Sequence, residues 1–228
     1  MCGRYSLTKS LDDLASFFEA YELLQRPNLA PRWNIAPTQK SFVLRSPAPG
    51  KGELVALRWG FAGPNNAPLI NARSETAASK PTFAEAFAKR RCLVPADSFY
   101  EWQAVEGQKA KQPQKQPWRI GLKGGGLFAF AGLWQSEPAH GGEECFTILT
   151  TAANDYLSPL HERMPVILPP ERFALWLDPT TPPGILQRLM QPYPAEAMAR
   201  YRVTSVVNGV KVDGPECFAP LNPALKVA

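Results

Sequence analysis

The first residues of the chain carry a candidate nucleophile. The sequence begins Met1-Cys2-Gly3-Arg4. Initiator methionine is commonly removed when the second residue is small, so we expect Cys2 to become the N-terminus. Cys2 would then carry an α-amine and a thiol on one residue. An α-amine has a pKa of about 8, against about 10.4 for lysine, so a far larger fraction of it is unprotonated and nucleophilic near neutral pH.

This pair of groups suits an aldehyde substrate. The amine would form a Schiff base, and the thiol, held a few bonds away at very high effective concentration, would close a five-membered thiazolidine ring. Gly3 would allow a substrate backbone to approach closely. The alternative is that Cys2 is a small apolar residue at the start of a strand.

A second candidate group lies in the segment from Leu69 to Thr76. Asn71 and Arg73 are two residues apart, so in an extended conformation both point to one face. Asn71 could hold a nucleophile or a substrate oxygen, and Arg73 could clamp a phosphate. The alternative is that this segment is a turn followed by a surface arginine with no functional role.

Two residues are candidates for proton transfer. Glu101 stands between Tyr100 and Trp102, a setting that raises the pKa of a carboxyl group towards acid–base use, although a surface glutamate on an edge strand is the ordinary alternative. His161 lies in a proline-stiffened loop, which suits an imidazole that moves protons. The other histidine, His140, lies in a glycine-flanked loop and is incidental in our interpretation.

Short strands must position these residues. Ser10 and Asp13 form an acidic capping box that predicts a helix start, and Thr82 with Glu85 predicts another. Further helices are expected at Pro170–Leu177 and Gly184–Met190. Alternation and β-propensity predict strands at residues 1–8, Glu53–Trp59, Ser98–Gln103, Trp118–Leu122, Leu127–Trp134, Cys145–Thr151 and Tyr201–Val207. Arg32–Thr38 is expected to be an extended loop and Val105–Pro117 an exposed one. This pattern predicts one α+β domain over residues 1–228, built on a mixed, curled sheet.

Composition narrows the class of protein. The 228 residues are 45% hydrophobic, enough for a substantial core. No apolar run approaches the roughly 20 residues of a membrane span and no signal peptide is visible, so we expect a cytoplasmic location. The four scattered cysteines and the lack of a CxxC pair predict free thiols and no metal. The net charge of +5 permits a polyanionic partner without requiring one.

Nine short motifs then occur in a specific order. They are Cys2–Arg4, Asn34–Pro37, Trp59–Phe61, Asn71–Thr76, Arg91–Pro95, Phe99–Trp102, Ala131–Trp134, Thr150–Asn154 and His161–Leu168. In order and spacing they resemble the SOS response-associated peptidase family, or SRAP domain, over nearly the whole chain. The resemblance implies a barrel-like core flanked by helices, autocatalytic or assisted removal of Met1, and a covalent crosslink to abasic sites in single-stranded DNA.

The resemblance also implies roles for individual residues. Cys2 would be the nucleophile, Asn71 would position its α-amine, and Glu101 and His161 would move protons. Phosphates would be held by Arg4, Arg73 and Arg163, and flanking nucleotides would contact Pro37, Trp59 and Trp102, a mode that tolerates any sequence. Ser98 departs from the glycine that the family often has there, which would narrow the site slightly.

No cofactor is implied, and we expect a monomer that associates with the nucleoid when it binds DNA. Two other functions stay open. A hydrolase of the N-terminal nucleophile type could use Cys2, Glu101 and His161 to cleave an external amide. A reader of modified bases could bind DNA without covalent chemistry.

Overall fold

The computed structural model describes residues 2–104, 115–137 and 141–222. Most of the expected loop Val105–Pro117, and also His140, lie outside these residues. Lys115–Pro117 are described, and for them the loop prediction is wrong. They begin strand β9 (Lys115–Leu122), because its pairing with β8 (Ser98–Ala104) continues as far as Ala104 opposite Lys115.

The strands form two sheets. The smaller sheet has the order β14-β9-β8-β1-β3, in which β1 is Tyr5–Leu7, β3 is Arg32–Ile35 and β14 is Met198–Arg202. The larger sheet has the order β12-β11-β10-β7-β4-β5-β2, with β13 beside β10 and β6 beside β11. Its strands are β2 (Glu22–Leu23), β4 (Lys40–Arg45), β5 (Lys51–Trp59), β6 (Asn71–Arg73), β7 (Arg91–Ala96), β10 (Phe128–Glu137), β11 (Glu143–Ala152), β12 (Arg163–Pro165) and β13 (Ile167–Leu168).

Parallel pairing between β5 and β11 closes part of the larger sheet into a ring. Arg58 lies opposite Cys145 and Trp59 opposite Phe146, so β5, β4, β7, β10 and β11 form a five-stranded barrel. A closed barrel leaves these strands with fewer free edges and encloses their inward side chains. The α+β class with a curled, barrel-like core is therefore confirmed.

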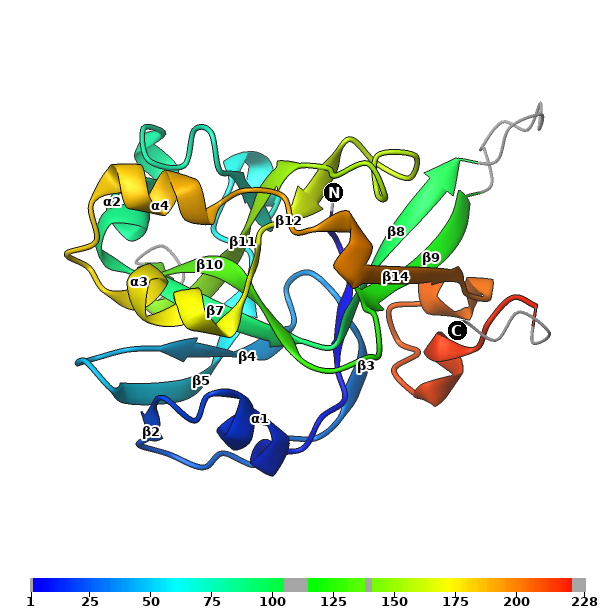
Figure 1. Ribbon diagram of the computed structural model, residues 1–228, viewed down its shortest axis with the longest axis horizontal. Helices are drawn as coiled ribbons and strands as arrows, with labels where there is room; N and C mark the ends of the chain where they lie inside the picture. The colour runs from blue at the N-terminus through cyan, green and yellow to red at the C-terminus, as the bar shows by residue number, and fades with distance from the viewer. Residues whose placement is uncertain (1, 105–114, 138–140, 223–228) are drawn as a thin grey trace.

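The strand that follows Cys2 is anchored in the core. Tyr5 packs edge-on against Trp59, with 5.1 Å between ring centroids, and against Phe130 at 5.9 Å. Trp59 in turn stacks on Phe146 with an interplanar angle of 8°. In Figure 1, β1 (blue) runs through the middle of the molecule. Aromatic packing on both sides of Tyr5 thus fixes the direction in which the chain reaches Cys2.

Helices cover the ends of the larger sheet. They are α1 (Leu11–Phe17), α2 (Pro81–Lys89), α3 (Phe173–Leu177) and α4 (Pro183–Leu189), with short 3-10 turns at Pro64–Asn66, Pro170–Arg172, Ala195–Ala197, Ser205–Asn208 and Pro215–Phe218. Figure 1 shows α2, α3 and α4 together at the end opposite the β8–β9 hairpin. No helix in the described part of the chain is long and apolar enough to cross a membrane.

The two predicted helix starts had different outcomes. The capping box that opens α1 is confirmed, since the Ser10 hydroxyl accepts from Asp13 N at 3.1 Å and the Asp13 carboxylate accepts from Ser10 N at 2.9 Å. The predicted start at Thr82 is wrong. Helix α2 begins at Pro81 without a side-chain cap, because proline at the first helical position already supplies a helical φ.

Two other boundaries differ from the prediction. The segment Arg32–Thr38 is not a loop throughout: Arg32–Ile35 is strand β3, held to β1 and to the carboxylate of Asp213, which accepts from Asn34 N at 2.8 Å. The last predicted strand, Tyr201–Val207, is displaced. Strand β14 occupies Met198–Arg202, and the residues after it turn into a 3-10 helix.

Candidate active site

Strands β1 and β8 bring the beginning of the chain to Glu101. Their antiparallel pairing places Tyr5 opposite Phe99, and Tyr100 N donates to the carbonyl oxygen of Arg4 at 3.0 Å. In an antiparallel pair, residues before Arg4 run alongside residues after Tyr100. Cys2 is fully buried, and its thiol is close enough to Glu101 for the two to interact electrostatically.

Burial sets the protonation of both groups. Loss of hydration, and then the negative charge of Glu101, raise the pKa of the Cys2 thiol well above its ordinary value. Burial also raises the pKa of the Glu101 carboxyl group, as its sequence setting predicted, while the charge of nearby His161 acts to lower it. The thiol is therefore protonated at neutral pH, and a carboxyl group suited to accepting its proton lies beside it.

His161 reaches this cluster from the segment between β11 and β12. Its Nδ1 accepts from the backbone N–H of Arg163 at 2.9 Å, so in the neutral ring Nε2 carries the proton. The segment is tied to β8 through Gln103, whose Nε2 donates to the carbonyl oxygen of Pro159 at 3.4 Å. Gln103 had no predicted role, although its position two residues after Glu101 on a strand indicated the same face.

Asn71 holds the backbone of Cys2. It lies on β6, which pairs in parallel with β11 so that Asn71 is opposite Ile148. The segment Asn71–Arg73 is therefore a strand and not the alternative turn. Its Nδ2 donates to the carbonyl oxygen of Cys2 at 3.0 Å. Its Oδ1 is buried and has no hydrogen-bond partner among the described residues. The amide thus fixes the carbonyl end of Cys2 and keeps one acceptor for a further donor.

A hollow of about 650 Å³ lies against Gly3, the residue after the buried cysteine. Arg4, Pro37 and Trp102, three of the predicted DNA contacts, line it together with the backbone of Gly3. The guanidinium of Arg4 lies 5.7 Å from the centre of the Trp102 ring and donates to Asn34 Oδ1 at 2.9 Å. The structure therefore brings these three residues to one surface beside the residue that follows Cys2.

Comparisons with known proteins identify the family of this chain. The family model described as SOS response associated peptidase (SRAP) matches residues 1–210. The chain belongs to the SRAP family. It is 39% identical to the abasic site processing protein YoqW of Bacillus subtilis, over 95% of this chain and 98% of the relative. It is 31% identical to the abasic site processing protein YedK of Escherichia coli, over 97% of this chain and the whole of the relative.

Solved structures share the SRAP fold of this chain. A phage-related protein from Bordetella bronchiseptica is 30% identical, with a TM-score of 0.71, and the match covers 89% of this chain and 94% of that protein. A protein from Bacteroides thetaiotaomicron has a TM-score of 0.78 over 95% of this chain and 98% of its own. At 22% identity, that match supports only a shared fold.

Three predicted DNA contacts of the SRAP chain lie outside the hollow. Trp59 is wholly buried, and its indole Nε1 donates to the carbonyl oxygen of Ile70 at 2.9 Å, so it is a core residue and its prediction as a nucleotide contact is wrong. Arg163 is mostly buried, and both ends of its guanidinium bind the Glu75 carboxylate at 2.6 and 2.8 Å, which occupies the edge expected to hold a phosphate. Arg73, at the end of β6, is exposed and accessible to a phosphate.

Ser98 does not narrow the site, contrary to the expectation. Alternation along β8 puts its side chain on the face opposite to that of Glu101. Its hydroxyl contacts the Ser6 hydroxyl, which also binds the buried carboxylate of Asp97. The departure from glycine at this position therefore acts on the far side of the sheet.

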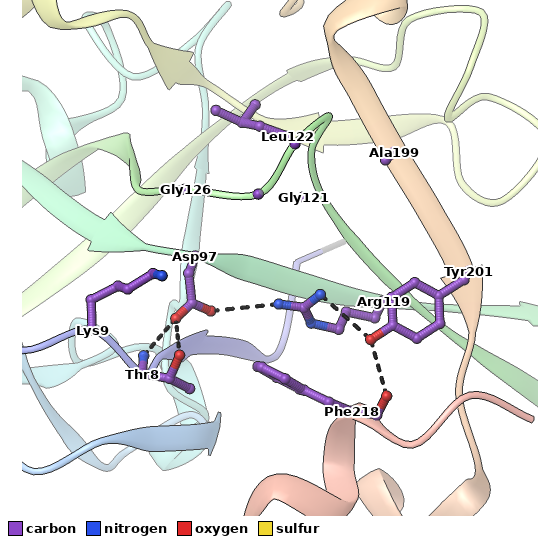
Figure 2. A pocket seen from close by; sticks show the side chains of 12 residues that line it. Thr8, Lys9, Asp97, Arg119, Gly121, Leu122, Gly126, Ala199, Tyr201 and Phe218 are labelled. Carbon is purple, nitrogen blue, oxygen red and sulfur yellow. Dashed lines mark hydrogen bonds and ion pairs between the residues drawn. The ribbon is translucent and has the colours of Figure 1, made fainter. Parts of the chain in front are cut away.

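A second hollow, of about 420 Å³, lies on that far side (Figure 2). Its carboxylate and its arginine are already engaged: Asp97 accepts from Thr8 N and Oγ1, each at 2.6 Å, and faces Arg119 at 4.0 Å. The Arg119 guanidinium also lies 3.8 Å from the centre of the Phe218 ring. Of the residues that the structure describes, no cysteine or histidine lines this hollow. In the described part of the chain no cluster of His, Cys, Asp and Glu side chains could hold a metal ion.

Proposed function

We propose that this SRAP protein, after loss of Met1, forms a covalent thiazolidine crosslink between Cys2 and the ring-opened sugar of an abasic site in single-stranded DNA. The observation that carries the proposal is that Asn71 and Glu101 both act on the second residue of the chain, and that His161 lies close enough to Glu101 to influence it. The relatives named abasic site processing proteins support the choice of an aldehyde-bearing DNA lesion as the substrate.

The first step uses the α-amine. The lone pair of the Cys2 nitrogen attacks the aldehyde carbon of the opened sugar, and the resulting carbinolamine loses water to give a Schiff base. The departing hydroxyl needs a proton, and His161 and Glu101 are the groups that can supply it. Asn71 Oδ1, buried without a partner among the described residues, is an acceptor for an N–H of the attacking amine.

The second step uses the thiol. Sulfur attacks the imine carbon, the thiol proton passes to the former imine nitrogen, and a five-membered ring closes with no further atom lost. Because the pKa of the Cys2 thiol is raised, little thiolate forms spontaneously, so transfer of this proton depends on a base alongside. We assign that transfer to Glu101, whose charge already acts on the thiol.

The hollow lined by Arg4, Pro37 and Trp102 would hold the nucleotide next to the lesion. Trp102 offers an aromatic face on which any base can stack, and Arg73 an accessible charge for a phosphate. Such contacts read no sequence, which suits a lesion that lacks a base.

The test is a crosslinking assay with the mature protein and single-stranded DNA containing an abasic site. We expect an adduct that survives heat and denaturant, is absent for Cys2→Ala, and is unchanged for Cys217→Ala, a buried cysteine in a different cluster. Cys2→Ser should give an adduct that persists only after borohydride reduction, since its hydroxyl is a poor substitute for sulfur.

Two other outcomes would support the alternative functions. Turnover of amide substrates by the protein in the absence of DNA would favour a hydrolase of the N-terminal nucleophile type. Equal retention of Cys2→Ala on intact and abasic DNA would favour a non-covalent reader.

A further inference from the structure

The outer strands of the smaller sheet carry an unusual group of arginine and aromatic side chains. Arg202 lies opposite Trp118 in the β14–β9 pair, and Arg200, two residues earlier, projects from the same face. Both guanidinium groups lie 5.1 Å from the Trp118 ring centre. Arg200 is also 4.5 Å from the ring centre of Tyr156. We call these four residues the Arg200–Trp118 surface.

This surface continues from the candidate active site. Trp118 lies directly opposite Glu101 in the β8–β9 pair, so the two side chains share one face of the sheet. The Trp118 indole Nε1 donates to Gln103 Oε1 at 3.0 Å, and Gln103 also binds the segment that leads to His161. Tyr156 belongs to that same segment. A DNA strand leaving the cysteine along this face would therefore meet Trp118 and then the two arginines.

The positive charge of the surface is not balanced locally. Among the described residues, neither Arg200 nor Arg202 forms an ion pair with a carboxylate. Arg119, on the opposite face of the same sheet, contrasts with them because it faces Asp97 and is covered by Phe218 (Figure 2). Arg202 is exposed, and a guanidinium stacked on an aromatic ring keeps N–H groups at its edge for a phosphate.

We propose that the Arg200–Trp118 surface binds single-stranded DNA beyond the abasic nucleotide, with the two arginines on successive phosphates and the uncovered part of the aromatic surface against a base. The choice of abasic DNA as the substrate rests on the proposed function. The choice of a single strand rests on the paired aromatic and basic groups, which are typical of sites that bind unpaired nucleic acid.

The experiment compares abasic oligonucleotides of about 4 and about 16 nucleotides, which bracket the usual lengths of single-strand sites. Binding and crosslinking are measured for the wild-type protein, Arg202→Gln, the double variant Arg200→Gln/Arg202→Gln, and Arg188→Gln as a control. Arg188 is an exposed arginine on α4, at the other end of the molecule in Figure 1. Arg202→Gln tests the surface without disturbing the bond between the Arg200 guanidinium and the Tyr156 carbonyl.

We expect the double variant to bind the long oligonucleotide about tenfold more weakly, with Arg202→Gln between it and the wild type. Its salt dependence, as log K against log salt, should be shallower by about 1.4, because each single-strand phosphate contact contributes about 0.7. Affinity for the short oligonucleotide and the behaviour of Arg188→Gln should match the wild type. Equal losses on both lengths, or an unchanged salt slope, would overturn the inference. If the wild-type protein binds abasic DNA but never crosslinks to it, the proposed function is wrong. The length and salt dependence of binding still show whether the Arg200–Trp118 surface binds DNA.

Discussion

Replacing Glu101 by glutamine tests the chemistry assigned to the site. Glu101 is only 5% exposed, so water cannot readily take over as the base once the carboxylate is lost. General acid–base groups of this kind contribute about 10²–10⁴-fold to a rate, which corresponds to roughly 3–5.5 kcal/mol of activation free energy. We expect Glu101→Gln to slow crosslink formation by that factor under single-turnover conditions. DNA affinity should change little, because the shape of the side chain is retained.

The same substitution slows the reaction but should stabilise the fold near neutral pH. Burial raises the pKa of the folded-state Glu101 carboxyl group, so the folded protein holds this proton at pH values where the unfolded chain has released it. The contribution of the Glu101 carboxyl group to stability is therefore fully present below its pKa in the unfolded chain. It is lost as pH rises through its higher pKa in the folded protein. Relative to the wild type, Glu101→Gln should gain stability as pH rises from acid to neutral.

Chemical denaturation at several pH values, together with crosslinking rates, checks both effects. A variant that crosslinks at the wild-type rate would refute the assignment of Glu101 as the proton-transfer group. A stability difference that does not change with pH would refute the argument from burial. A variant that is less stable at every pH would point to a structural role for the carboxylate.

Substitutions at three further positions test individual contacts. Asn71→Ala removes the hydrogen bond to the Cys2 carbonyl and should lower the free energy of unfolding by about 1–3 kcal/mol, measured in urea, and slow crosslinking, whereas unchanged kinetics would exclude a positioning role. Ser98→Gly should lower stability by about 1 kcal/mol without raising the crosslinking rate, and a faster rate would show that Ser98 does narrow the site. Trp59→Ala should destabilise the fold by about 3–5 kcal/mol, and Trp59→Leu, which has no aromatic face, should retain wild-type affinity for DNA, which a stacking role would not allow.

The local features of the site followed from sequence patterns. β-Propensity and alternation predicted β8 and β11, and the two-residue spacing of Asn71 and Arg73 indicated that both would point to one face if their segment were extended, as it is in β6. The position of Glu101 between aromatic residues predicted its burial and the direction of its pKa shift. These predictions succeeded because each depends on neighbours within a few residues.

The errors arose where distant segments decide the outcome. Strand β3 is held by Asp213, which is far away in the chain. Trp59 is buried because β5 pairs with β11 and closes the barrel, and its local sequence does not reveal this pairing. Arg163 is neutralised by Glu75 from another segment, so a motif alone could not show that its guanidinium is occupied.

The intact mass of the species formed on abasic single-stranded DNA shows whether Cys2 forms the crosslink after Met1 is lost. We expect a mass equal to that of the protein without Met1 plus that of the oligonucleotide, less one water, with the linkage located at Cys2 after proteolysis. An adduct that retains Met1, or one attached to a different residue, would contradict it.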